Sequence, residues 1–242
     1  MDQHSLHSPF IYELYTKVIR PKKWASPYAQ IEKVREKFKS NDQTISIEDF
    51  GSGSYVDNSS ERKISDIALK GISKKKYSEI FARLIDYEGF KNIIELGTSL
   101  GINTLYLSSN ADSHVTTFEG AEELCKMAIS SFKSTRSNVD VVEGNIDDTL
   151  PEFLKNSKKI DLAFFDANHN YESTLSYFHQ CRKKAHDESC FIFDDIHLSQ
   201  DMERAWREIQ QYYEVTVSID LFQVGLVFFN PELTKQHYIL EI

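Results

Sequence analysis

The chain has 242 residues, of which 40% are apolar and 27% are charged. This length and composition are typical of one large α/β domain with a short extension, and they allow a sizeable core. Asp and Glu (37) outnumber Lys and Arg (28), so the formal charge is -9. Because nucleic-acid binding depends on clustered basic residues, this balance argues against a nucleic-acid partner. The one basic run, 74–76, is interpreted as a solvated helix face.

The cysteines and the apolar runs indicate the compartment. Cys125, Cys181 and Cys190 show neither paired metal-ligand spacing nor an even disulfide framework, so we expect reduced thiols. Residues 1–20 mix charged with apolar residues, so no signal-peptide core is expected. No apolar run approaches the roughly 18–20 residues that span a bilayer. These features predict a cytoplasmic protein without a membrane partner.

The first part of the chain predicts helices without a core of their own. Amphipathic helices are expected over 11–19 and 29–38, and Pro21 and Pro27 interrupt the helical geometry between them. After a turn-rich loop, two more helices are expected, over 63–68 and 75–86. We therefore expect residues 1–88 to form a helical extension, or a lid, that packs on a main domain formed by residues 89–242.

From residue 92 onward, the pattern alternates between short apolar runs and helical stretches. Buried parallel strands are predicted over 92–96, 114–118, 139–142, 162–165 and 190–193. The helical stretches are 104–109, 122–132, 150–156, 171–185 and 200–212. This alternation predicts an α/β fold with a doubly wound, mostly parallel sheet. The runs 214–219 and 223–229 leave no room for a helix between them, so they should form an antiparallel hairpin at one sheet edge.

A glycine loop follows the first of these strands. Gly97 lets the chain turn sharply, and Gly101 allows close approach of helix and ligand. Glu119 ends the second strand, 18 residues after Gly101, where a carboxylate can accept both hydroxyls of a ribose. Ser99 stands where a dinucleotide-binding G-x-G-x-x-G loop has its middle glycine. A cofactor without phosphates, such as S-adenosylmethionine, is therefore favoured.

A second acidic-Gly-x-Gly stretch lies upstream, at residues 48–54. No second strand with a terminal carboxylate follows it at the right distance, because the next thirty residues look helical. We interpret it as a flexible loop, and two roles stay open: closing over a substrate, or simply connecting two elements.

Acidic side chains follow the fourth and fifth predicted strands. Asp166 ends one strand and Asp194 and Asp195 end the next, so their carboxylates should converge at the carboxyl edge of the sheet. Crowded carboxylates repel one another unless a cation is present, and Mg²⁺ or Ca²⁺ prefers such oxygen ligands. His169 could remove a proton from a metal-bound hydroxyl. The alternatives are that Asp194 or Asp195 only caps the following helix and that His169 only binds backbone in a loop.

Together, these motifs resemble class I S-adenosylmethionine-dependent O-methyltransferases. The resemblance covers about residues 90–230 and is nearest to the metal-dependent enzymes that act on catechols, caffeoyl-coenzyme A and macrolide sugars. It implies a Rossmann-like sheet of seven strands closed by the reversed hairpin. It also implies that residues 89–242 are the S-adenosylmethionine-binding domain. The implied cofactor-binding residues are Glu95, Gly97, Thr98, Ser99, Gly101, Asn103, Glu119, Asn145 and Asp166.

The same resemblance implies a catalytic pair, His169 and Asp166, and a divalent cation, such as Mg²⁺, held by Asp166, Asp194 and Asp195. Catechol-type enzymes have Lys at the position of His169 and Asn at that of Asp195, whereas the sugar-modifying relatives use a His base and an acidic pair. The expected acceptor is therefore a small hydroxylated molecule, a sugar or a phenol. His197 is expected to lie behind these groups.

Two other functions stay open. One is an N-methyltransferase acting on a macromolecule, although such enzymes typically carry a [D/N]-P-P-[Y/F] loop and none of the five prolines here are adjacent. The other is a non-catalytic domain that binds the cofactor or only keeps the fold. A homodimer is compatible with the fold, but nothing in the sequence requires it.

Overall fold

The computed structural model describes residues 8–47 and 61–242. Its centre is a sheet of eight strands in the order β10-β8-β9-β7-β6-β3-β4-β5. The strands are β3 (Asn92–Leu96), β4 (His114–Glu119), β5 (Val139–Glu143), β6 (Leu162–Phe165), β7 (Cys190–Phe193), β8 (Val217–Asp220), β9 (Gly225–Phe228) and β10 (Gln236–Ile239). Only β9 runs antiparallel to its neighbours β7 and β8. This arrangement confirms the predicted doubly wound, mostly parallel sheet with an antiparallel hairpin near its C-terminal end.

The sheet has one strand more than the seven that were expected. β10 adds to the sheet beyond the hairpin and runs parallel to β8, so β10, and not the hairpin, forms this edge. Its side chains are exposed except for that of Tyr238, as is usual for an edge strand. A short strand with a single buried residue lacks the continuous apolar run from which the other strands could be predicted.

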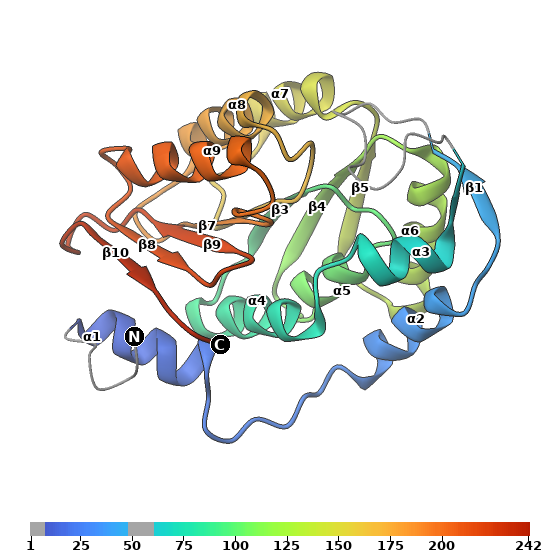
Figure 1. Ribbon diagram of the computed structural model, residues 1–242, viewed down its shortest axis with the longest axis horizontal. Helices are drawn as coiled ribbons and strands as arrows, with labels where there is room; N and C mark the ends of the chain where they lie inside the picture. Colours follow the sequence, from blue (N-terminus) through green and yellow to red (C-terminus); the bar gives the residue numbers. More distant parts are fainter. Residues whose placement is uncertain (1–7, 48–60) are drawn as a thin grey trace.

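Helices cover both faces of the sheet (Figure 1). One face carries α7 (Ile146–Asn156), α8 (Tyr171–Cys181) with a short 3₁₀ extension, and α9 (Gln200–Gln211). The other face carries α1 (Pro9–Leu14), α4 (Lys75–Glu88), α5 (Ile102–Leu107) and α6 (Glu122–Thr135). Successive residues of each strand point to opposite faces, so β6 contributes Phe164 to one apolar cluster and Phe165 to the other.

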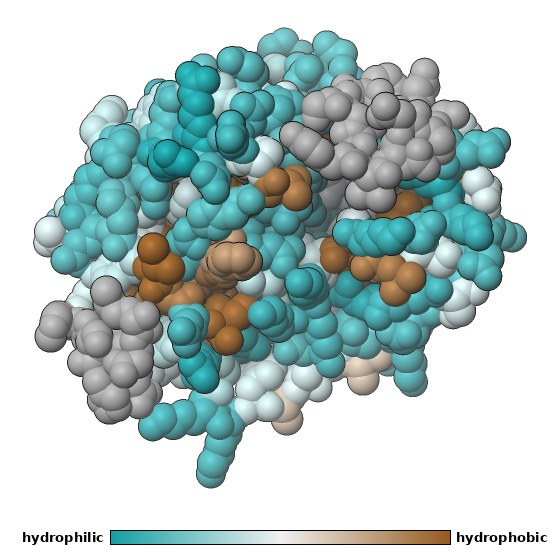
Figure 2. Space-filling model, in the orientation of Figure 1, coloured by the Kyte–Doolittle hydropathy of each residue, from teal (hydrophilic) through white to brown (hydrophobic). Residues whose placement is uncertain are grey.

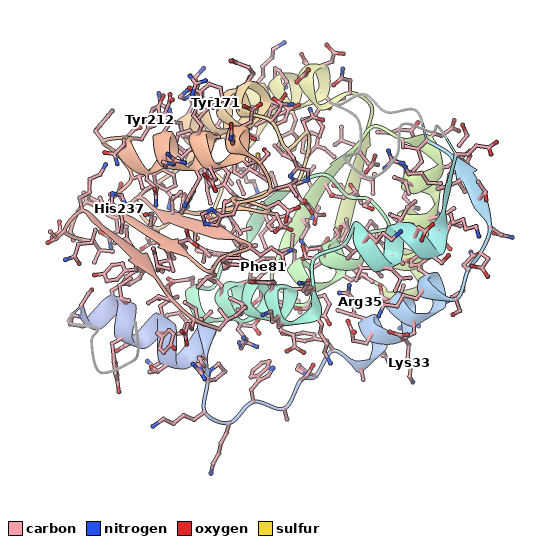
Figure 3. All side chains as sticks on the ribbon, in the orientation of Figure 1. Lys33, Arg35, Phe81, Tyr171, Tyr212 and His237 are labelled. Carbon is pink, nitrogen blue, oxygen red and sulfur yellow. The ribbon has the colours of Figure 1, made fainter. Side chains whose placement is uncertain are left out.

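The N-terminal segment packs on the main domain in two separate places. α1 continues as a π-helix, η2 (Tyr15–Ile19), which lies against α4, where Arg83 Nε donates to the carbonyl of Val18 at 2.6 Å. α2 (Ala29–Lys39) and α3 (Ile64–Lys70) lie at the other end, against α5, with a small antiparallel sheet of β1 (Thr44–Ser46) and β2 (Glu61–Lys63). Between them, α4 packs on the central sheet: Phe81, labelled in Figure 3, lies 5.1 Å from Phe164 of β6 between ring centroids.

The surface in Figure 2 is mostly hydrophilic, with apolar side chains gathered in two areas, one over β8–β10 and one beside α3. Within the residues that the structure describes, no helix is long and apolar enough to cross a membrane. The upstream acidic-Gly-x-Gly stretch at 48–54 lies outside the described residues, so both roles suggested for it stay predictions.

Candidate functional site

The site lies where the strand order changes direction. From β3, the chain builds outward through β4 and β5 on one side and through β6 and β7 on the other. In open α/β sheets, ligands bind outside the carboxyl ends of the strands at such a point. Gly97 leaves β3 with a φ of +100°, and a Cβ on it would stand 2.2 Å from the carbonyl oxygen of Asp166. Only glycine therefore allows the loop after β3 to lie against the end of β6.

The loop after Gly97 is held to the end of β4 by Glu119. Ser99, with a φ of +51°, donates its backbone N–H to Glu119 Oε2 at 2.8 Å, and Ala121 donates its N–H to Oε1 at 3.0 Å. Gly101, with a φ of +76°, starts α5 in close contact with the ring of Phe132. The structure thus brings the predicted glycine loop and the predicted ribose carboxylate together.

Three of the predicted cofactor residues lie deeper. Glu95 is fully buried and accepts hydrogen bonds from Asn103 Nδ2 (3.1 Å), Thr104 Oγ1 (2.5 Å) and Thr117 Oγ1 (2.7 Å). Burial raises the pKa of Glu95 to about 7, although these three donors lower it. Thr98 is buried and bonded to Thr117. Asn103 Oδ1, by contrast, is buried and has no hydrogen-bond partner among the residues that the structure describes. Asn103 is therefore the residue of this group with an acceptor left for a ligand, and Glu95 holds it in place.

Asn145 lies after β5, at the start of α7. Its Oδ1 accepts the N–H of Asp147 at 3.0 Å, so the side chain caps this helix. This contact explains why α7 begins at Ile146, four residues before the predicted start. The expected adenine-binding role of Asn145 stays a prediction.

Asp166 and His169 form a pair in the turn after β6. His169 Nε2 lies 3.4 Å from Asp166 Oδ1. Burial lowers the pKa of His169, but the hydrogen bond to Asp166 and the charges of Asp166, Asp195 and Asp194 outweigh it and raise the pKa to about 9. His169 therefore carries a proton at neutral pH while these carboxylates are uncompensated.

Asp194 and Asp195 follow β7 directly. Asp194 is 3% exposed, and its oxygens accept the N–H of Asp195 (2.9 Å) and the hydroxyl of Ser73 (2.8 Å). Burial and the charges of Asp166 and Asp195 raise the pKa of Asp194 well above its usual range. Burial likewise raises the pKa of Asp195, despite the opposing charge of His169. The two carboxylates therefore lie in one electrostatic group with Asp166 and His169.

Neither aspartate caps a helix. The side chain of Asn170 caps α8 and that of Ser199 caps α9. The interpretation that Asp194 or Asp195 serves only as a helix cap is therefore wrong. Helix capping does not offset the free-energy cost of placing these carboxylates away from water. Backbone strain gathers at the same edge, because positive φ angles occur at Ser99 (51°), Asn168 (62°), His169 (25°) and Asp195 (53°). Such strain is typical of sites where function fixes the geometry.

The carboxylates do not form a closed metal site as they stand. Among the described parts of the chain, no group of three or more His, Cys, Asp or Glu side chains is arranged to hold a metal ion. The donors are nevertheless chemically suited to Mg²⁺, which often uses one or two protein carboxylates and takes its other ligands from water and substrate.

His197 lies behind this group, against β8. Its Nε2 is 2.8 Å from Asp220 Oδ2, and Asp220 Oδ1 accepts the N–H of Phe222 at 2.7 Å. The residue thus ties the turn after β7 to the turn after β8.

Sequence reasoning missed Ser73 and Lys74, which lie just before α4. Ser73 binds Asp194 directly, and the charge of Lys74 lowers the pKa of Asp195. The basic run 74–76 was interpreted only as a solvated face. Nothing in the spacing around Ser73 indicates a contact with a residue 121 positions later.

This fold, with its glycine loop and strand-end carboxylates, defines a class I methyltransferase architecture. A family model described as a methyltransferase domain matches residues 94–196. The matched range begins in β3 and ends just after Asp195, so it contains the glycine loop, Glu119 and the three aspartates. The match confirms the predicted resemblance to class I methyltransferases and the expected enzyme class.

Solved structures agree on the fold. The O-methyltransferase from Bacillus cereus in complex with SAH has a TM-score of 0.63 at 17% identity, covering 90% of this chain and 97% of that one. The O-methyltransferase TomG from Streptomyces achromogenes, involved in tomaymycin synthesis and solved with SAM, has a TM-score of 0.59 at 18% identity, with coverages of 65% and 81%. The SAH-bound methyltransferase PaMTH1 from Podospora anserina gives 0.58 at 14%, with coverages of 86% and 98%. No curated protein matches the chain.

Proposed function

We propose that this protein transfers a methyl group from S-adenosylmethionine to a hydroxyl of a small molecule, with the help of a divalent cation. The observation that carries the proposal is the convergence, at one sheet edge, of the glycine loop with an acid–base group in which Asp194 is buried and the other members are partly buried. Gly97 packs on the backbone of Asp166, and Asp166 in turn pairs with His169. A structural element that only preserved the fold would not need strained backbone and crowded like charges at this point.

The cofactor would occupy the crevice above the loop. Glu119 would bind the ribose hydroxyls, and the buried acceptor Asn103 Oδ1 would take a donor from the methionine end. The architectures solved with SAM and SAH support this assignment at the level of the fold. Asn145 and Asp166 are the proposed contacts at the adenine and methionine ends, respectively.

The acid–base group sets what this chain can do with the acceptor. When bound, the sulfonium supplies an electrophilic methyl group, and a divalent cation would lower the pKa of the acceptor hydroxyl. Asp166 orients the His169 ring through Nε2. At neutral pH the ring holds a proton, because nearby carboxylate charge raises its pKa to about 9. Positive charge among these carboxylates would offset their effect on the pKa of His169. The ring could then take up the proton of the acceptor hydroxyl.

The acceptor class and the compartment are also part of the proposal. The pairing of a histidine with acidic residues favours an aliphatic hydroxyl, as on a sugar, and a phenol is the second choice. The three cysteines are free and buried, which supports a cytoplasmic protein. Residues 1–88 are proposed as the segment that covers the acceptor, with Ser73 as its contact to the carboxylates.

The proposal is tested by calorimetric titration of S-adenosylhomocysteine and, separately, of Mg²⁺ into the purified protein. We expect micromolar binding of S-adenosylhomocysteine that is lost in Glu119→Ala, and a Mg²⁺ signal that is lost in Asp194→Asn. Cofactor binding without a Mg²⁺ signal would keep the methyltransferase and remove the cation, leaving the Asp166–His169 pair as the acid–base group. No cofactor binding would overturn the proposal in favour of a non-catalytic domain.

A further inference from the structure

Ser73 is the point at which the N-terminal segment touches the carboxylate group. It lies between α3 and α4 and is 3% exposed. Its hydroxyl donates to Asp194 Oδ2 at 2.8 Å, while the other oxygen of Asp194 accepts the N–H of Asp195. Both oxygens of this carboxylate are thus engaged, one by the loop before α4 and one by the backbone after β7, and its orientation is fixed.

The hydroxyl of Ser73 is not used by the helix that follows it. α4 begins with Lys74 at its N-cap, one residue after Ser73, and no side chain caps this helix. The hydroxyl reaches across the molecule instead, to a carboxylate 121 positions later in the chain.

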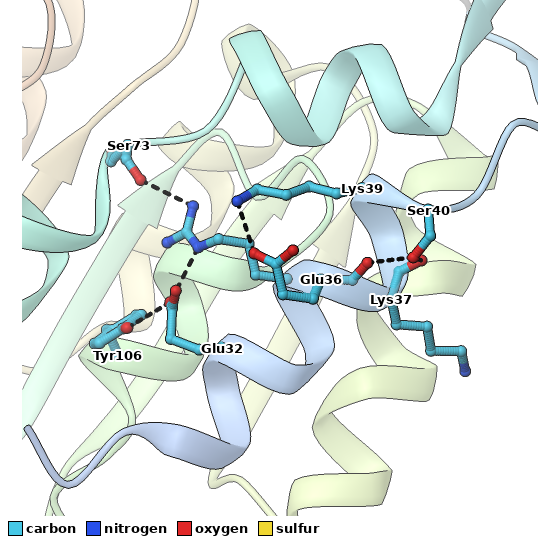
Figure 4. A network of polar contacts seen from close by, with 8 residues as sticks. Glu32, Glu36, Lys37, Lys39, Ser40, Ser73 and Tyr106 are labelled. Carbon is cyan, nitrogen blue, oxygen red and sulfur yellow. Dashed lines mark hydrogen bonds and ion pairs between the residues drawn. The ribbon is translucent and has the colours of Figure 1, made fainter.

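Arg35 of α2 holds the backbone of Ser73 from behind. Its Nη1 donates to the carbonyl oxygen of Ser73 at 3.1 Å, and its Nε lies 3.0 Å from Glu32 Oε1. The hydroxyl of Tyr106, on α5, donates to the same oxygen of Glu32 at 2.7 Å (Figure 4). Arg35 is 4% exposed, so water screens this chain of contacts little. The chain runs from α5 through α2 to the loop before α4 and ends on Asp194.

We propose that Ser73 is a positioning residue that fixes the Asp194 carboxylate in the crevice, and that Arg35 positions Ser73 from α2. The N-terminal segment then contributes a residue to the carboxylate group of the site, in addition to its proposed role of covering the acceptor. The role in cation binding rests on the proposed function, whereas the orientation of Asp194 does not.

The proposal is tested by Mg²⁺ titration of three serine variants. Ser73→Ala should weaken Mg²⁺ binding about 10-fold or more, the usual effect of removing a group that orients a metal ligand, and leave S-adenosylhomocysteine binding unchanged. Ser73→Thr keeps the hydroxyl and should retain most of the affinity. Ser78→Ala is the matched control, because Ser78 lies on α4, is fully buried and has no hydrogen-bond partner for its hydroxyl among the described residues. Wild-type Mg²⁺ affinity in Ser73→Ala would overturn the proposal.

A double-mutant cycle tests the role of Arg35. If Arg35 acts through Ser73, Arg35→Lys should weaken Mg²⁺ binding in the wild-type background and have little further effect in Ser73→Ala. Equal effects in both backgrounds would contradict this order of action.

The crystal structure of Ser73→Ala separates this proposal from the proposed function. If the wild type gives no Mg²⁺ signal, the cation is lost from the proposed function. A rotated Asp194 carboxylate in Ser73→Ala would then still support positioning, and an unmoved one would overturn it.

Discussion

Gly97 shows how a single missing side chain sets the site. A side chain at this position would carry two costs. A φ of +100° strains a residue with a Cβ, and that Cβ would lie 2.2 Å from the carbonyl oxygen of Asp166. We expect Gly97→Ala to lower the free energy of unfolding by about 3–5 kcal/mol. Gly89→Ala is the control: its φ is +71°, but a Cβ there would meet no atom within 4 Å from other described parts of the chain, so about 1 kcal/mol is expected. Urea denaturation measures both, and equal losses would show that the contact with Asp166 does not exist.

Glu95 should make stability depend on pH. Its pKa is raised from 4.5 to about 7 by burial, so the folded state keeps a proton that the unfolded state has lost. The stability from this proton is fully present below pH 4.5 and is lost as the pH rises through 7, a loss of about 3 kcal/mol in all. Chemical denaturation of Glu95→Gln between pH 4 and 8, compared with the wild type, should show this slope removed.

Asp161, near the amino edge of the sheet, provides a control of opposite sign. Burial raises its pKa, but the hydrogen bonds from the N–H groups of Asn92 and Lys91 and from the ring of His186 outweigh burial. The pKa of Asp161 is therefore below its usual value. Its contribution to stability is present at neutral pH and is lost as the pH falls through the folded pKa. Asp161→Asn should therefore flatten only the acid limb. Loss of the slope between pH 4.5 and 7 in this variant would contradict the assignment to Glu95.

The site residues that could be predicted from the sequence are those that stand at the ends of strands. Gly97, Glu119, Asp166 and Asp194 each follow an apolar run, and parallel strands bring their carboxyl ends to one edge. Ser73 could not be predicted, because its contact depends on how α4 packs on the sheet. The burial of Glu95 could not be predicted either, because the motif gives the position of a residue in the loop and not how deep its side chain lies.

At the scale of elements, periodicity predicted the strands β3–β9 and most helices, because each buries an apolar stripe or run. It failed where an element buries few residues, and where a side-chain cap determines the residue at which a helix begins. β10 has one buried residue, and α7 begins early because Asn145 caps it. The π-helical turn of η2 is decided by packing against α4, which no local pattern records.

The close approach of α9 to β9 leads to a testable prediction. Gly225 pairs with Phe193 and Asp220 in the sheet, and a Cβ on it would lie 2.6 Å from the ring of Trp206. Because that ring is buried, Gly225→Ala should destabilise the fold by about 1–3 kcal/mol. Trp206→Phe creates space, so the double variant should lose less stability than the sum of the single changes. Additive losses in urea denaturation would indicate that α9 does not press on β9.

At the scale of the whole molecule, the N-terminal segment is joined to the main domain at both ends and in the middle. η2 shares one apolar cluster with α4 and with β8 and β9, while α2 and α3 share another with α5 and α6. Figure 1 shows α1 and α2 under opposite ends of the sheet, with α4 between them. The apolar clusters therefore do not separate at residue 88, and the functional boundary expected there stays a prediction.

The two tryptophans of the chain test whether it unfolds as one unit. Trp24 lies between η2 and α2, with the guanidinium of Arg83 4.9 Å from its ring, and Trp206 is a buried residue of α9 in the main domain. Trp206→Phe leaves Trp24 as a fluorescent probe of the N-terminal segment, and Trp24→Phe leaves Trp206 as a probe of the main domain. Because the clusters span both parts, each single-tryptophan variant should show one urea transition that coincides with its own loss of helical circular dichroism. A fluorescence transition of Trp24 that precedes the loss of helix would instead show that residues 1–88 detach as a lid while the methyltransferase domain stays folded.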